Sequence, residues 1–325
     1  MAAKSGMEGE NKSKIAIVGS GLIGQNWAMI FASVGYRVAI YDVVPEQLTR
    51  AHALIKDTLG RYEKEGHLRG KLTSTEQIQN ITACSSLTDC LEGAVHVQEC
   101  VPEDLNLKVT VFQELDKHCS NGMVVASSSS CLPASSFTES LEHRNNMLVA
   151  HPINPPYFIP LVEIVPAPWT DQAVVNKTRA LMENIGQSPV TLKYEAPGFA
   201  LNRMQYAIIN ESWNMYQTGL LSAEDIDRVC HTGLGLRYAF IGPLETMHLN
   251  ANGMVDYCQR YADGAEKVQK ETFKQIPVKY DIPTAEKIQE EFESYLPLDK
   301  IPQRRTWRDG WLAALASLKL ADDKK

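Results

Sequence analysis

Residues 14–24 read KIAIVGSGLIG, and they carry the clearest signal for the fold. Residues 14–19 form a short apolar, β-branched run, which is typical of a strand buried on both faces of a parallel sheet. A helical pattern follows over residues 22–33, and a second apolar run, Tyr36–Tyr41, ends at Asp42. The stretch therefore predicts a strand, a glycine-rich turn and a helix that leads into a second strand.

The same alternation continues through the first 196 residues. Further apolar runs occur at Ala94–Val101, Met123–Ala126, Met147–Ala150, Leu161–Val165 and Pro189–Lys193. Helical patterns lie between several of them, at Pro45–Glu65, Asp104–Cys119 and Asp171–Ile185. Alternating strands and helices connect through right-handed crossovers, so we expect an α/β fold with a Rossmann-type, doubly wound, mostly parallel sheet.

After this region the strand signals fade and the chain reads mainly as helices. These are expected at Gly198–Tyr216, Ser222–Cys230, Pro243–Leu249 and Asn252–Phe273, with a peripheral helix after Asp299. The sequence thus predicts a disordered extension over residues 1–13, an α/β domain over residues 14–196 and an all-helical domain over residues 197–325.

Composition excludes several classes of protein. The net charge is −7 at pH 7, which argues against a nucleic-acid partner. The sequence contains no run of about 18 apolar residues, so it predicts no membrane span. The first residues lack the apolar stretch of a signal peptide. The seven cysteines include no Cys-x-x-Cys pair, so we expect free thiols in a reducing compartment, the cytoplasm, and no metal site.

The glycine loop is the strongest functional signal. Gly19, Gly21 and Gly24 match Gly-x-Gly-x-x-Gly, a pattern that is weak alone but specific between a strand and a helix. In this motif Gly19 permits the tight turn and Gly21 lets the backbone approach a pyrophosphate. Gly24 allows the helix and the strand to pack closely.

Two further features define the cofactor. The amides of Leu22 and Ile23 lie at the expected helix N-terminus, where the helix dipole attracts phosphates. Asp42 ends the next strand, where a carboxylate can accept hydrogen bonds from ribose hydroxyls and repels the extra phosphate of NADP. We therefore expect NAD as the cofactor; the alternative is a glycine-rich turn beside an incidental acid.

A second constellation consists of His151 and Glu163. His151 follows an apolar run and is expected at the C-terminal end of a strand, where ligands bind in open α/β sheets. Glu163 interrupts the apolar run Leu161–Val165, and a carboxylate inside a buried strand needs a partner. The two would make a tuned general base, although a structural His–Glu pair explains the spacing equally well.

The order of these motifs resembles that of the 3-hydroxyacyl-CoA dehydrogenase superfamily. The motifs are the glycine loop, the serine run Ser127–Ser130, His151-x-x-Asn154 with the later Glu163, and Gly198–Arg203. The resemblance extends over about Lys14–Leu249. It implies an NAD-dependent dehydrogenase that dimerises through its helical domain, with His151 and Glu163 as the catalytic dyad.

The resemblance also implies roles for four other residues. Ser130 and Asn202 fall on residues that orient the reacting oxygen, and Glu103 and Lys108 fall on residues that line the nicotinamide end of the cofactor. Ordinary explanations stay open for three of them. Ser130 could be a helix cap, Asn202 an exposed helix residue, and Lys108 a solvated surface lysine.

The region around Arg237 departs from the pattern of the CoA-ester enzymes. Residues 235–243 are longer than the corresponding segment and add Arg237, and His248 stands where those enzymes usually carry aspartate. Both differences favour a free carboxylic acid, with Arg237 binding its carboxylate from a glycine-containing bend between two helices. The alternative is a surface arginine paired with an acid such as Asp227.

The favoured function is therefore NAD-dependent oxidation of the 3-hydroxyl of a small free hydroxy acid by a homodimer, with no nucleic-acid or membrane partner. Two alternatives stay open. One is a 3-hydroxyacyl-CoA dehydrogenase, and the other is an abundant NAD(H)-binding structural protein, a role to which one family member is recruited.

Overall fold

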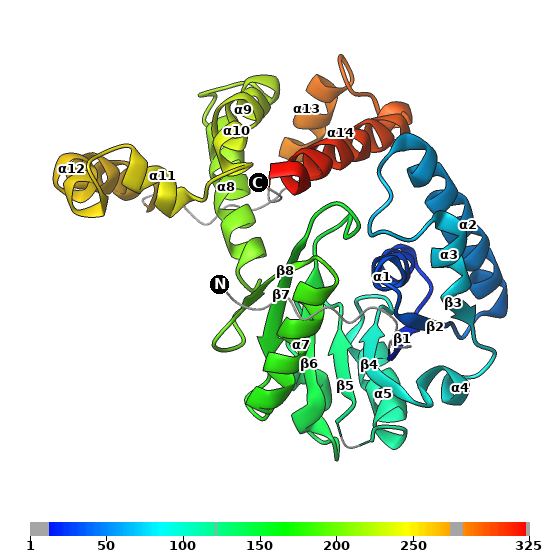
Figure 1. Cartoon of the computed structure of the whole chain (residues 1–325). Coiled ribbons are helices and arrows are strands. Elements are labelled where there is room, and N and C mark those ends of the chain that lie inside the picture. Colours follow the sequence, from blue (N-terminus) through cyan, green and yellow to red (C-terminus); the bar gives the residue numbers. More distant parts are fainter. Residues whose placement is uncertain (1–12, 121, 274–281, 323–325) are drawn as a thin grey trace. The chain divides into compact units, whose positions relative to one another are not determined.

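The computed structural model describes residues 13–120, 122–273 and 282–322 (Figure 1). Apart from Ser13, the expected N-terminal extension lies outside these residues. The chain divides into two compact units. The first runs to Leu201 and resumes at Trp307, and the second is Asn202–Thr306. The expected division near Ala196 stays a prediction, and the terminal helix belongs largely to the first unit.

An eight-stranded sheet forms the centre of the first unit, in the order β3-β2-β1-β4-β5-β6-β7-β8. The strands are β1 (Lys14–Val18), β2 (Arg37–Tyr41), β3 (Ile81–Ala83), β4 (Ala94–Glu99), β5 (Val124–Ser127), β6 (Met147–Pro152), β7 (Leu161–Pro166) and β8 (Ser188–Thr191). All neighbouring strands run parallel except β6 and β7. This confirms the doubly wound, mostly parallel sheet.

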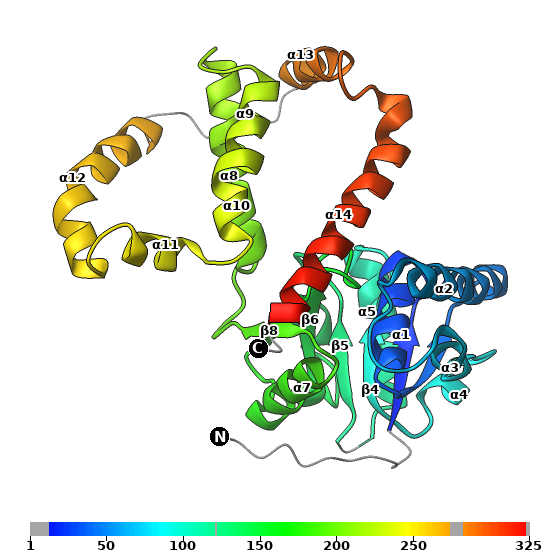
Figure 2. The ribbon, with the colours of Figure 1, turned by 45° about the horizontal axis from the view of Figure 1, so that its top comes forward.

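Helices cover both faces of this sheet (Figure 2). They are α1 (Leu22–Ser33), α2 (Pro45–Glu65), α3 (Ser74–Gln79), α4 (Leu87–Leu91), α5 (Leu105–Lys117), α6 (Ser135–Thr138) and α7 (Gln172–Asn184), with a short 3₁₀ turn at Arg144–Asn146. Trp27, Ile55 and Met182 bury α1, α2 and α7 in one core. Phe112 and Phe137 bury α5 and α6 in the other.

Several boundaries differ from expectation for local reasons. Asp104 does not begin α5 but caps it, since its carboxylate accepts a hydrogen bond from the Leu107 amide at 2.8 Å. The helix expected from Gly198 begins only at Leu201, because Gly198 (φ 75°) and Phe199 (φ 49°) adopt left-handed backbone conformations.

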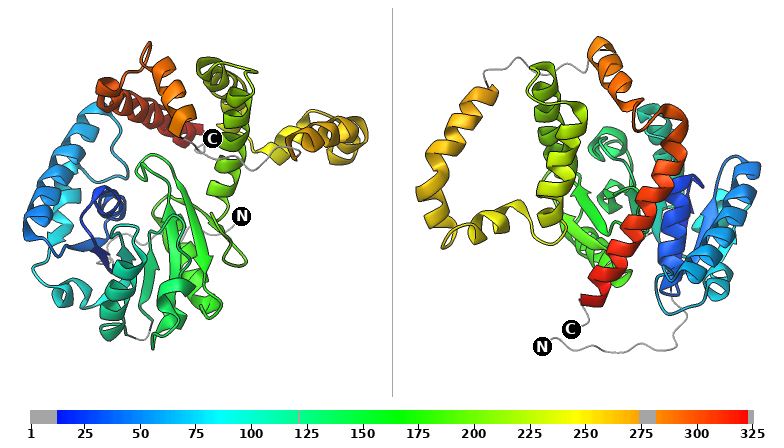
Figure 3. Two further views of the ribbon diagram at one scale, coloured as in Figure 1. Left: turned by 180° about the vertical axis from the view of Figure 1, so that it is seen from behind. Right: turned by 90° about the horizontal axis from the view of Figure 1, so that it is seen from above.

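The second unit is helical in its described part (Figure 3). Its helices are α8 (Leu201–Gln217), α9 (Ala223–Val229), α10 (Gly235–Tyr238), α11 (Pro243–Leu249), α12 (Met254–Phe273) and α13 (Ile282–Phe292). A 3₁₀ turn, Leu298–Lys300, precedes α14 (Ile301–Asp322). Ser222, the first residue of the helix expected there, is the N-cap of α9, because its hydroxyl accepts a hydrogen bond from the Asp225 amide at 3.2 Å.

The expected bend before Arg237 is wrong. A π-helical turn, Cys230–Leu234, joins α9 directly to α10. Gly235 is helical itself (φ −61°, ψ −36°), and an added Cβ atom would lie 3.1 Å from the Cys230 carbonyl oxygen. Glycine therefore permits close packing of the π turn rather than a change of direction.

The described residues include all seven cysteines and most of the helical segments, which bear on the expected free thiols and on the expected lack of a membrane span. All seven cysteines are free thiols. None of the described helices has the length and apolar character that crossing a membrane requires.

Candidate active site

The glycine loop connects β1 to α1, and its three glycines meet different surroundings. At Gly19 (φ 105°) an added Cβ would lie 2.8 Å from the Cys100 backbone, and at Gly24 it would lie 2.0 Å from the Gly19 carbonyl oxygen. At Gly21 an added Cβ would have no heavy atom within 4 Å. The fold itself thus requires Gly19 and Gly24, whereas Gly21 leaves open space above the start of α1, which fits a pyrophosphate.

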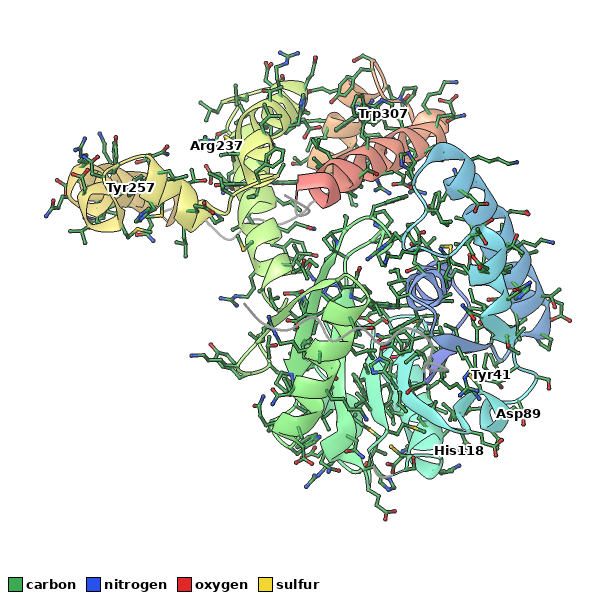
Figure 4. The ribbon with its side chains drawn as sticks, in the orientation of Figure 1. Tyr41, Asp89, His118, Arg237, Tyr257 and Trp307 are labelled. Atoms are coloured by element: carbon green, nitrogen blue, oxygen red, sulfur yellow. The ribbon has the colours of Figure 1, made fainter. Side chains whose placement is uncertain are left out.

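The start of α1 is suited to bind phosphate. Gly21 is its N-cap and provides no side-chain hydrogen bond, so no capping side chain occupies the first-turn amides, which include Leu22 and Ile23. Asp42 directly follows Tyr41, the last residue of β2 (Figure 4). Its Oδ2 accepts hydrogen bonds from the Ser20 amide at 2.8 Å and hydroxyl at 2.7 Å. The Asp42 carboxylate therefore lies against the glycine loop, as a ribose-binding acid must.

The dyad is held by the antiparallel pair β6–β7, in which His151 and Glu163 are direct cross-strand partners. His151 lies within β6 rather than after it. Its Nδ1 is 2.8 Å from Glu163 Oε2. The other carboxylate oxygen, Oε1, accepts hydrogen bonds from the backbone amides of Ala200 and Leu201 at 2.7 and 2.8 Å. The left-handed turn at residues 198–199 directs these amides at the carboxylate.

These contacts set the protonation of the pair. Burial alone would raise the pKa of Glu163, but hydrogen bonds from His151 and from the Leu201 and Ala200 amides outweigh it and hold that pKa below its ordinary value. An ionised carboxylate only accepts, so His151 carries its proton on Nδ1 and offers the Nε2 lone pair. Within the described residues no side chain or backbone group binds that Nε2, which suits it to accept a proton.

Phe199 packs beside the dyad. Its ring centroid is 5.9 Å from that of His151, and the side chain is buried. Its left-handed conformation costs about 1 kcal/mol or more in a non-glycine residue. Strain of this kind is common at functional sites.

Glu103 organises residues 127–131, which we call the serine turn. Its Oε1 accepts hydrogen bonds from the Ser129 hydroxyl at 2.7 Å, the Ser130 amide at 2.8 Å and the Cys131 amide at 3.1 Å. Partial burial alone would raise the pKa of Glu103. These hydrogen bonds and the Lys108 ammonium outweigh burial and lower that pKa to about 2. Ser130 is not a helix cap, since α6 begins at Ser135 with Ala134 as its N-cap.

Lys108 is not a solvated surface lysine, because only 1% of its side chain is exposed. Its ammonium is 3.0 Å from each oxygen of Glu99 and 3.5 Å from Glu103. Glu99 is not among the expected site residues. It lies in an apolar strand run, however, and a carboxylate in such a run is the same signal that identifies Glu163. Lys108 also shares a helix face with the buried Phe112 and Leu115, a spacing that could have revealed its burial.

The two candidates in the second unit are described separately. Asn202 lies in the first turn of α8 and is half-buried. Arg237 lies exposed on α10 (Figure 4). Its side chain has no hydrogen-bond or ion-pair partner in the part of the chain described, so the pairing with Asp227 is not formed there. Asn154 is exposed and contributes no described contact to the dyad.

The fold and these motifs define a class of protein. Residues 14–195 match the profile described as 3-hydroxyacyl-CoA dehydrogenase, NAD binding domain, and residues 198–281 match 3-hydroxyacyl-CoA dehydrogenase, C-terminal domain. The chain belongs to the 3-hydroxyacyl-CoA dehydrogenase family and is an NAD-dependent oxidoreductase of that family.

Individual relatives narrow the comparison. Lambda-crystallin homolog of Bos taurus is 50% identical over 94% of this chain and 95% of its own. L-carnitine dehydrogenase of Streptomyces coelicolor is 35% identical over 74% of each chain. The solved structure of 5-formyl-3-hydroxy-2-methylpyridine-4-carboxylic acid 5-dehydrogenase superposes with a TM-score of 0.78. It covers 95% of this chain and 97% of its own at 24% identity, a likeness of fold.

Proposed function

We propose that the protein oxidises the 3-hydroxyl of a small free hydroxy acid, with L-gulonate as substrate and 3-dehydro-L-gulonate as product. Related acids such as 3-hydroxybutyrate would react in the same way. The observation that carries this proposal is the His151–Glu163 pair at the C-terminal edge of an NAD-binding sheet, where ligands of this fold bind. The seven free thiols support a reducing compartment, the cytoplasm.

In the proposed mechanism His151 Nε2 accepts the hydroxyl proton of the substrate. Glu163 keeps the proton on Nδ1 and stabilises the imidazolium that forms. Ser130 and Asn202 orient the oxygen as it changes from alcohol to ketone. Bound NAD⁺ supplies the hydride acceptor. The Gly19–Gly24 loop, Asp42, Glu103 and Lys108 are the residues proposed to hold it.

Two observations support a free acid over a CoA thioester, although the family takes its name from thioester enzymes. Arg237 is exposed and its side chain has no ion-pair partner among the described residues, so its guanidinium can bind a carboxylate with two parallel hydrogen bonds. One relative is named for L-carnitine, which is itself a free 3-hydroxy carboxylate. The test is a spectrophotometric screen of NAD⁺ reduction across hydroxy acids and 3-hydroxyacyl-CoA esters. Thioester activity far above that on every free acid would reject the proposal.

A structural role is a second candidate, because the relative with 50% identity is named a lambda-crystallin homolog. The intact dyad indicates that such a role would be additional to catalysis. Measuring the abundance of the protein in its source tissue, together with its turnover, separates the two.

Asp42 should set the cofactor preference. We expect NAD⁺ to be preferred to NADP⁺ by more than about tenfold, or about 1.4 kcal/mol, because the carboxylate repels a 2′-phosphate. Asp42→Ser should reduce the difference in kcat/KM between NAD⁺ and NADP⁺. Asp57→Ser, on the exposed face of α2, should leave this difference unchanged. Equal efficiency with both cofactors in the unmodified protein would refute the assignment.

Arg237 should bind the substrate carboxylate. Arg237→Met should lower kcat/KM for L-gulonate and 3-hydroxybutyrate at least about tenfold, mainly through KM, since a charge-assisted hydrogen bond contributes about 1.5–3 kcal/mol. Arg237→Lys should recover part, because lysine keeps the charge but loses the fork. NAD⁺ affinity should stay constant.

A matched control is Arg228→Met, which removes an exposed arginine that is paired with Glu224 and Asp225 on α9. It should leave the KM for both acids unchanged. Normal handling of these acids by a folded Arg237→Met protein would show that another group holds the carboxylate.

We also propose that the protein is a homodimer that associates through its helical unit. Large apolar side chains stay exposed there: Met204, Ile208, Leu236, Phe240, Leu244 and Leu249. Exposed apolar side chains that gather into one patch are typical of an interface. Light scattering at micromolar concentration should give twice the 36.2 kDa chain mass. A single monomeric mass would contradict the proposal.

A further inference from the structure

A buried charged cluster lies beside the serine turn, at the C-terminal ends of β4 and β5. Glu99 is the last residue of β4 and Ser127 the last of β5, and the two are direct strand partners. Glu99 is completely buried. Its carboxylate accepts hydrogen bonds from the Ser127 hydroxyl and the Val101 amide, both at 2.6 Å, besides its two contacts with Lys108.

The carboxylate is therefore fully engaged, although its environment disfavours its charge. Burial raises the pKa of Glu99, and the Lys108 ammonium and the Ser127 hydroxyl oppose that rise. A buried ion pair adds little stability over a well-packed apolar pair. Stability is thus a weak reason for placing an acid and a lysine here, and their contacts suggest a positional role.

We propose that Glu99 is a positioning residue that holds the serine turn at both ends. Its carboxylate binds the Ser127 end directly. It reaches the other end through Lys108, whose ammonium lies between Glu99 and Glu103. Glu103 in turn accepts the Ser130 amide and, at 3.3 Å, its hydroxyl. The catalytic consequence rests on the role proposed above for Ser130.

The position of this charged cluster supports an effect of Glu99 on the active site. Val18, at the end of β1, is the strand partner of Glu99, so the cluster borders the glycine loop. The strand order reverses direction between β1 and β4, which is where a dinucleotide crosses such a sheet. Because Asp42 follows β2, the other half of a bound dinucleotide would extend over β4 and β5, toward the serine turn.

Glu99→Gln is the principal test, and Cys131 supplies a readout that does not depend on turnover. The Cys131 thiol is exposed, and its Sγ is 3.4 Å from Glu103 Oε1. Burial and the Glu103 carboxylate raise its pKa. In Glu99→Gln the Lys108 ammonium keeps Glu103 as its only carboxylate partner in the cluster and should draw it away from the turn. Alkylation of Cys131 should then accelerate at least about threefold, since the thiolate is the reactive form.

Mass spectrometry would follow alkylation of Cys131, with the exposed Cys258 of the same protein as internal reference. Glu114→Gln, which removes an exposed ion pair with Lys117 on α5, is the matched control and should change neither alkylation nor turnover. Should Glu99→Gln not fold, Ser127→Ala removes the hydroxyl that binds Glu99, together with its contacts to the Ser129 amide and the Lys108 ammonium, and should also accelerate the alkylation.

Turnover provides the second readout. Glu99→Gln should lower kcat by about 10- to 100-fold, the effect of a misplaced reacting geometry. Because part of the effect of Glu99 passes through Lys108, adding Glu99→Gln to Lys108→Met should lower kcat less, and accelerate alkylation of Cys131 less, than Glu99→Gln does in the unmodified protein.

The outcomes separate the two proposals. An unchanged Cys131 rate in a folded Glu99→Gln or Ser127→Ala protein would overturn the role of Glu99, as would full additivity of Glu99→Gln with Lys108→Met. Absence of hydroxy-acid oxidation by the unmodified protein would instead overturn the proposed function, and the alkylation rates would still test the cluster.

Discussion

His151→Gln should lower the turnover number about 10²- to 10⁴-fold, the usual contribution of a positioned general base. Glutamine fills a similar volume but has no nitrogen that accepts a proton. NAD⁺ affinity should change little, because the glycine loop is formed by other strands. Stopped-flow absorbance for turnover and fluorescence titration for NAD⁺ would measure the two effects.

His143→Gln is a matched control. His143 also pairs with a carboxylate, at 3.0 Å between its Nδ1 and Asp116 Oδ1, but it precedes β6 and lies at the other end of that strand. Its loss should leave turnover near normal. A His151 variant with turnover close to that of His143→Gln would remove the basis of the mechanism.

Glu163→Gln should also lower turnover, for a reason visible in its contacts. One oxygen binds His151 and the other binds the amides of residues 200 and 201. Glutamine has a single acceptor oxygen and cannot serve both. The pKa of Glu163, like that of Glu103, is held below the usual carboxyl range, so neither group titrates near neutral pH. Because oxidation of the alcohol by NAD⁺ releases a proton, oxidation should be favoured as pH rises, and ketone reduction should be favoured as pH falls.

Much of the fold could be predicted because its signals are local. The apolar run before the glycine loop, the acid after β2 and Pro45 at a helix start determine β1, α1 and α2, whose bounds agree with expectation. Other elements gave weak signals. β3 has three residues, of which only Ile81 is buried, so neither length nor alternation marks it as a strand. The antiparallel direction of β7 follows from residues 153–160, a connection too short for a crossover.

The site was predictable where a charge interrupts an apolar strand, and less so where contacts depend on distant backbone. The His151–Glu163 pairing follows from the sequence, but the amides that fix Glu163 come from beyond Phe199, whose left-handed conformation no pattern indicates. The burial of Lys108 likewise depends on the tertiary contact with Glu99. The spacing of apolar residues predicts which face of a helix or strand is buried. It does not predict which charged side chains form ion pairs in the interior.

The glycine loop should separate folding from cofactor binding in a pair of variants. Gly24→Ala places a Cβ atom 2.0 Å from the Gly19 carbonyl oxygen, so α1 must move away from β1. Overpacking of this kind lowers the free energy of unfolding by about 1–3 kcal/mol or more. The protein should melt at a clearly lower temperature and lose NAD⁺ binding with it.

Gly21→Ala should behave oppositely. Its backbone (φ −65°, ψ −174°) suits any residue, and the added Cβ meets no heavy atom within 4 Å, so the melting temperature should stay close to that of the unmodified protein. The methyl group would occupy space that the pyrophosphate needs, so NAD⁺ affinity should fall at least about tenfold, or about 1.4 kcal/mol. Gly60→Ala, in an equally open position on α2, should leave NAD⁺ affinity unchanged. Calorimetric titration and thermal melts would measure both quantities. A Gly21→Ala protein that binds NAD⁺ normally would place the pyrophosphate elsewhere, because no contact among the described residues requires glycine at this position.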